Sequence, residues 1–171
     1  MDPISLYRQE IEWAHDLLER VMVDVTPEMA HQHPPGIANP IGATYAHALM
    51  TEDGVSSLYL TRAAPLFQRE WAGKTGVSQP RMGQTLEWSR SLQVDLPAAR
   101  QYAQAVYTNT GRYLDSLTEL ETQRVVNLSG AGLGKRTVSW VLSALIAGHV
   151  HNMAGEISAL KGVLGAKGYP F

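Results

Sequence analysis

Cysteine is absent from all 171 residues. This absence excludes disulfides, thiolate metal ligands and a cysteine nucleophile, and it fits a reducing cytosol. Neither sign of charge dominates, because 14 lysine and arginine residues stand against 16 aspartate and glutamate residues. A balanced chain has no extended field of one sign with which to hold nucleic acid or an anionic membrane. Any chemistry must therefore come from histidine, carboxylate and other polar side chains.

Long apolar runs are also missing. The first residues, MDPISLYRQEIEW, are acidic where a signal peptide would be basic and then apolar. No stretch approaches the roughly 20 uninterrupted apolar residues of a membrane span. The length suits a single domain with a core of its own. We therefore expect one soluble, cytoplasmic domain over residues 1–171, with no nucleic-acid or membrane partner.

Four segments show helical periodicity, with apolar residues recurring at spacings of three and four. They are residues 3–25, 41–62, 96–117 and 137–165. Asp2 and Pro3 form a cap and first-turn pair before the first segment, and Thr137 and Gly165 are suited to begin and end the last. No strand pattern is strong enough for a large sheet. The sequence thus predicts an all-α four-helix bundle.

The connections between these helices are long. Residues 64–94 are interrupted by glycine and proline, and they contain a predicted short helix at 85–92. Residues 118–136 predict a turn of helix, a brief strand at 124–128 and then a flexible, glycine-rich linker. The linker is not a phosphate-binding loop, because Arg136 stands where that motif needs serine or threonine. Connections of this length permit crossovers between helices.

The last helix carries polar groups on its apolar stripe, which is unusual for a face that packs against a core. The polar residues are His149, Asn152 and Glu156, and Met153 lies on the same side. His47 falls one turn into the second helix, and Thr51 follows one turn later on the same side. On the first helix, Trp13 is expected at the border of the stripe and His15 in solvent. A lone helical histidine is most often packed or solvated, so these residues alone leave the roles of His47 and His149 open.

The order and spacing of four pieces resemble the DinB/YfiT-like superfamily of four-helix bundles, including its DUF664-type members. The pieces are the leading helix, ANPIGATYAHALMTED, AGHVHNMAGEISALKGVLG and the closing GAKGYPF. The resemblance implies a divalent metal, such as zinc or nickel, held by a histidine of helix two and an H-x-x-x-H pair of the last helix. His47 and His149 match two of these ligands, whereas Met153 stands in the place of the third histidine.

Three interpretations follow from this departure. In the first, His47 and His149 still hold a metal with help from Met153, Asn152 or Glu156. In the second, the metal is lost and the same residues line a small-molecule pocket. In the third, they are satisfied polar residues of a structural core.

Two functions from different classes accompany these interpretations. Some members of the superfamily are transferases that use the metal to activate a low-molecular-weight thiol such as mycothiol or bacillithiol. The resemblance therefore implies a metal-dependent thiol S-transferase with a degenerate metal site. The alternative is a metal-free module that binds a small molecule or a protein. A homodimer formed through the edges of the first and last helices is expected in either case.

Overall fold

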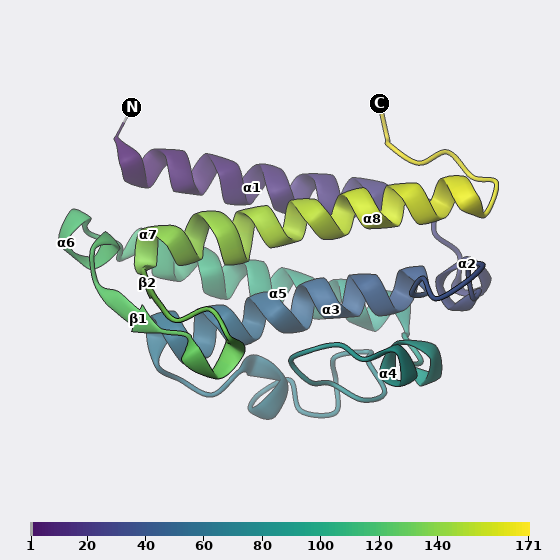
Figure 1. Ribbon diagram of the computed structural model, residues 1–171, viewed down its shortest axis with the longest axis horizontal. Helices are drawn as coiled ribbons and strands as arrows, with labels where there is room; N and C mark the ends of the chain where they lie inside the picture. Colours follow the sequence, from purple (N-terminus) through teal and green to yellow (C-terminus); the bar gives the residue numbers. More distant parts are fainter. Residues whose placement is uncertain (1) are drawn as a thin grey trace.

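The computed structural model describes residues 2–171, and its framework is four long, roughly parallel or antiparallel helical rods (Figure 1). The first three rods are α1 (Pro3–Met22), α3 (Ile41–Gly54) and α5 (Leu96–Asp115). The fourth runs from α7 (Val138–Trp140) through a π-helix (Val141–Gly148) into α8 (His149–Val163). The α8 helix packs against α1 and α3, and α5 packs against the other sides of α3 and α1. The predicted all-α bundle is therefore confirmed.

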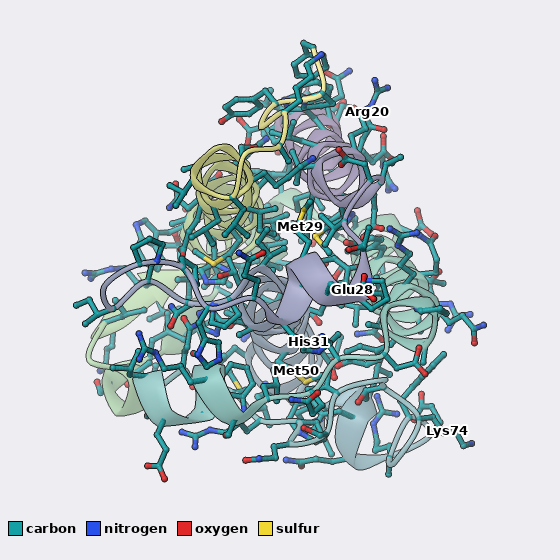
Figure 2. All side chains as sticks on the ribbon, turned by 90° about the vertical axis from the view of Figure 1, so that its right-hand side faces the viewer. Arg20, Glu28, Met29, His31, Met50 and Lys74 are labelled. Carbon is teal, nitrogen blue, oxygen red and sulfur yellow. The ribbon has the colours of Figure 1, made fainter. Side chains whose placement is uncertain are left out.

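The N-terminal rod ends earlier than its periodicity predicts. Asp2 accepts a hydrogen bond from the backbone of Ser5 and so caps α1, which stops at Met22 and not near residue 25. Thr26 then caps a second, unpredicted helix, α2 (Pro27–His31). Figure 2 views the bundle end-on and shows α2 lying across this end of it. The partly buried side chain of Met29, on α2, packs against the hydrophobic core of the bundle.

Two of the four rods contain wide turns. The α3 helix continues as a π-helix (Val55–Thr61), and a second π-helix leads directly into α8. Each π turn holds one residue more than an α turn, so it shifts the apolar stripe around the helix. In α8 the fully buried positions are consequently Val150, Ala154 and Ile157, whereas His149 and Met153 lie at the edge of the packed face. Near the π turn the buried positions therefore lie one residue after Leu145 and Met153, whereas Ile157 and Leu160, which regular spacing also places on the stripe, are buried as expected.

The connection from residue 62 to residue 95 is anchored by the buried carboxylate of Asp53. Its oxygens accept hydrogen bonds from the backbone amides of Leu66 at 2.8 Å and Phe67 at 3.1 Å. The hydroxyl of Tyr102 donates to the same carboxylate at 2.6 Å. A short 3-10 turn (Leu66–Gln68) follows, and α4 (Leu86–Ser91) confirms the short helix predicted here. Asp53 therefore ties this long loop to the bundle.

The connection before the last rod is not a flexible linker. It contains α6 (Glu119–Thr122) and a 3-10 turn (Ser129–Ala131), and its strands β1 (Val125–Asn127) and β2 (Lys135–Thr137) pair antiparallel. Only the first strand was predicted. The second forms because Leu128 donates its amide hydrogen to the carbonyl of Gly134 at 2.7 Å, and Gly134 adopts φ 68°, which favours glycine.

Within residues 2–171, no helix is both long and apolar enough to span a membrane.

Candidate histidine site

Two histidines from different rods meet inside the bundle. Nε2 of His47, on α3, lies 3.3 Å from Nε2 of His149, the first residue of α8. The two rings meet edge to face, with centroids 5.0 Å apart and an interplanar angle of 79°. The structure therefore brings together the two residues that the sequence singled out as a pair.

The π-helix before His149 depends on a glycine. A Cβ atom added at Gly148 would lie 2.9 Å from the backbone oxygen of Ser143. Real Cβ atoms essentially never approach backbone this closely, so any side chain would force the wide turn to open or move. Since Gly148 directly precedes His149, this glycine helps to set the position of the second imidazole.

The other ring nitrogens of the pair differ in their surroundings. Nδ1 of His47 lies 3.3 Å from the hydroxyl of Thr51, one turn further along α3. Nδ1 of His149 is buried and has no hydrogen-bonding partner among the described residues. The ring of His47 is thus oriented by a hydroxyl, whereas one nitrogen of His149 is left unsatisfied.

Both imidazoles are uncharged at neutral pH. Burial, reinforced by the neighbouring His149, lowers the pKa of His47 to about 4. Burial also lowers the pKa of His149, although the carboxylate of Glu52 acts in the opposite direction. One Nε2 atom must therefore carry the hydrogen that the other accepts, and a proton rarely competes for the accepting lone pair.

The remaining predicted site residues are distributed around this pair. Thr51 contacts it directly, as described above. Glu156 accepts a long hydrogen bond from the hydroxyl of Thr44 at 3.4 Å. Met153 is partly buried and packs against the main apolar cluster, and Asn152 is exposed. Hydrogen bonds therefore link only three of the six predicted residues to one another, namely His47, Thr51 and His149.

The donor set fits part of a metal centre. Two nitrogen ligands of a tetrahedral zinc ion, at Zn–N distances of about 2.0–2.1 Å, lie about 3.3 Å apart. The Nε2 separation of 3.3 Å matches this spacing. Within residues 2–171, however, no group of three or more histidine, cysteine, aspartate or glutamate side chains is arranged to hold a metal. The residues present fit two positions of such a centre and do not form a three-histidine site.

A second polar pair was missed by the sequence analysis. His15 is not solvated, because its side chain is only 12% exposed and its Nε2 lies 2.9 Å from both carboxylate oxygens of Glu52. Glu52 is fully buried and also accepts a hydrogen bond from the hydroxyl of Thr110 at 2.7 Å. A signal for this was present: His15 follows Ile11 by four residues and precedes Leu18 by three, which places it on the apolar stripe.

Fold and histidine pair together define a class of protein, an all-α bundle with paired imidazoles contributed by its second and fourth long helices. The sequence profile of the DinB superfamily matches residues 10–154, so the chain belongs to the DinB superfamily. A conserved protein from Enterococcus faecalis has a similar crystal structure, with a TM-score of 0.80 over 96% of this chain and 99% of that chain. The two sequences are 19% identical, so this likeness concerns the fold. No curated protein sequence matches the chain.

Proposed function

We propose that His47 and His149 form a two-histidine site for a divalent metal ion, and that this site serves transfer chemistry on a low-molecular-weight thiol. The observation that carries the proposal is the separation of 3.3 Å between the two Nε2 atoms, which equals the spacing of two ligands on one tetrahedral ion. Membership of the DinB superfamily supports the same interpretation. The inferred partner is a small molecule.

Each residue of the site has a separable task. His47 and His149 supply two nitrogen lone pairs, and their lowered pKa values keep these lone pairs free of protons at neutral pH. Thr51 can accept the Nδ1 hydrogen of His47 and so leave its Nε2 free for an ion. A bound divalent ion would lower the pKa of a coordinated thiol and so supply a thiolate at neutral pH. Met153, four residues after His149, offers a thioether on the same face of the helix.

The second candidate is a metal-free module that binds a small molecule through the paired imidazoles. It is favoured by the absence of a third nitrogen or carboxylate ligand among the described residues. Thioether sulfur prefers softer ions than zinc or nickel, so Met153 only weakly replaces a histidine. The two candidates differ in whether the unmodified chain retains a metal at all.

Metal titration of tag-free protein separates the two candidates. Calorimetry with zinc and with nickel is performed on the wild type, His149→Ala and Met153→His. The proposal expects one ion per wild-type chain, loss of binding in His149→Ala, and binding at least about ten-fold tighter in Met153→His, because a third imidazole completes the set. Thiol transfer is then assayed on the loaded wild type, with mycothiol and bacillithiol as probes.

The variant with a third histidine makes a negative result informative. If Met153→His binds zinc but the wild type does not, replacement of a single ligand has removed the metal, and the metal-free module is the correct candidate. Retention of the metal by His149→Ala would instead show that the ion lies elsewhere in the chain. Either result would overturn the metal-site proposal.

A further inference from the structure

A separate cavity lies between α1 and α5, whereas the paired histidines come from α3 and α8. Its volume is about 260 Å³. Arg8, Glu12 and His15 line it from α1, and Tyr107 and Gly111 are among the residues that line it from α5. This volume is below the range of drug-sized pockets, so any occupant is small.

The ring of His15 is fixed in this cavity by two contacts. Its Nε2 is hydrogen-bonded to both oxygens of the buried Glu52, and its plane stacks on Tyr107 with centroids 3.8 Å apart. These two contacts keep the ring from turning, so it presents a fixed surface to the cavity. The hydroxyl of Tyr107 donates to Glu19 at 2.7 Å, which holds the stacking partner in place. The polar wall of the cavity is thus preorganised.

Arg8 supplies a positive charge with which an anionic ligand can pair. In the free protein its Nη2 lies 2.9 Å from Oδ1 of Asp115. The side chain of Asp115 is 70% exposed, and exposed ion pairs contribute little net stabilisation. An anion in the cavity can therefore compete with Asp115 for Arg8. The carboxylate of Glu12, in the same lining, offsets part of the charge of Arg8, so the site favours a ligand with one negative charge over a ligand with two.

The rest of the lining is suited to an apolar body. Ile11 and Leu114 are both buried residues that border the cavity. We propose that the cavity between α1 and α5 binds a small monocarboxylate with an apolar body. The carboxylate pairs with Arg8, and the body packs on Ile11 and Leu114 beside the stacked rings of His15 and Tyr107. This site uses none of the residues of the histidine pair, so it stands independently of the proposed function.

Benzoate is the probe, with neutral benzamide as its matched control. Two-dimensional NMR of the full chain is expected to show saturable shifts at the amides of Thr108 and Gly111 and at the ring of His15. Benzamide is expected to produce none of them. Shifts that do not saturate, or equal shifts with both compounds, would contradict the proposal.

Three variants test the geometry without removing the buried Glu52. Arg8→Gln is expected to weaken the binding of benzoate by about ten-fold or more, because a charge-assisted contact is lost. Asp115→Asn is expected to tighten it by roughly two- to five-fold, because it removes the competing carboxylate from an exposed pair. Weaker binding in Asp115→Asn would overturn the proposed competition.

The third variant fills the cavity. A Cβ atom at Gly111 would meet nothing within 4 Å, so Gly111→Leu places its side chain into open space on a helix that favours leucine over glycine. Abolished benzoate binding is expected, with a thermal midpoint at or above that of the wild type. Benzoate binding that survives in folded Gly111→Leu would show that the ligand occupies another place and would overturn the proposal.

Discussion

Nε2 of His47 lies 3.3 Å from Nε2 of His149, although 102 residues separate them in the chain. The pair is held by the packing of α3 against the fourth rod, and its burial keeps both rings uncharged at neutral pH. Protonating either ring would place a positive charge in a poorly solvated site beside a second imidazole. The contact is therefore sensitive to acid.

Acid should destabilise the protein through this pair. Because the pKa of His47 falls from 6.5 to about 4 on folding, the unfolded state binds more protons between these values. The free energy of unfolding should therefore be unaffected by this group above pH 6.5 and should decrease as the pH falls toward 4. We expect a loss of about 2 kcal/mol, less than the full shift implies because the ring is partly solvated.

Urea unfolding at pH 7.0, 5.5 and 4.0 measures this loss. His47→Gln is the comparison, because glutamine keeps hydrogen-bonding capacity and does not titrate. The difference in stability between wild type and variant should shrink as the pH falls. A difference that is constant from pH 7.0 to 4.0 would rule out His47 as the source of the acid sensitivity.

Asp53→Asn should release the long loop that follows α3. Asparagine keeps one acceptor oxygen, but its amide nitrogen cannot accept the bonds made to the other, which come either from Leu66 or from Phe67 and Tyr102. We expect a loss of about 2–4 kcal/mol of stability, because buried donors lose their partner. Hydrogen exchange should accelerate selectively at the amides of Leu66 and Phe67.

Tyr102→Phe is the matched control for that loop. It removes a single hydroxyl and leaves both backbone bonds to Asp53 in place. We expect a loss of about 1 kcal/mol and no selective acceleration of exchange at Leu66 or Phe67. If both variants loosened these amides equally, the carboxylate would not be the anchor of the loop.

Lys161→Met should weaken the contact between α1 and α8. Lys161 is only 3% exposed, and its ammonium donates to the backbone oxygen of Val21 at 3.0 Å and to the carboxylate of Asp24. This hydrogen bond lowers the pKa of Asp24. Methionine preserves most of the packing but leaves the end of α1 without its donor, at a cost of about 1–3 kcal/mol.

Chemical denaturation of Lys161→Met and Asp24→Asn separates the two partners. Asp24 is largely exposed, so its loss should cost less than about 1 kcal/mol. Equal losses in the two variants would mean that the ion pair, and not the bond to Val21, provides the stabilisation.

Two glycine-to-alanine variants should have opposite effects. Gly148→Ala brings a Cβ atom to within 2.9 Å of the oxygen of Ser143, so we expect a loss of about 1–2 kcal/mol and a disturbed His149. Gly111→Ala meets no atom within 4 Å and should gain up to about 1 kcal/mol from helix propensity. Thermal unfolding of both variants measures the difference. A stabilised Gly148→Ala would show that the π turn does not need glycine.

The local sequence was sufficient for the helices that have strong periodicity and marked ends. Asp2, Thr85 and Asp95 all cap helices at or next to the predicted starts, because a capping side chain satisfies amides of the same short segment. The extra helix α2 was missed although Thr26 and Pro27 carry the same kind of signal. A helix of five residues is too short for its periodicity to be recognised.

The candidate site was predicted only in part, because local spacing does not show which distant side chains meet. His47 and His149 were selected through family resemblance. His15 and Glu52 were not selected, although the side chain of His15 is only 12% exposed and that of Glu52 is fully buried. The partner of His15 lies 37 positions away in the chain, so no local spacing identifies it. In the last helix, the π turn moves the buried position from Met153 to Ala154, and a regular 3.6-residue spacing does not predict this change. The buried position of Lys161 was likewise not predicted, because its partners lie at the C-terminal end of α1, far away in the sequence.

The sequence by itself determined the helical class and the limits of most of the long helices, because these depend on contacts within a few residues. Its composition also excluded thiol chemistry by the chain's own side chains. The tertiary structure decided which polar groups meet. The separation of the two imidazoles, the contact of Glu52 with His15 and the contact of Lys161 with α1 all depend on how the long helices pack against one another. Such contacts join residues far apart in the chain, so their geometry exists only once the bundle has formed.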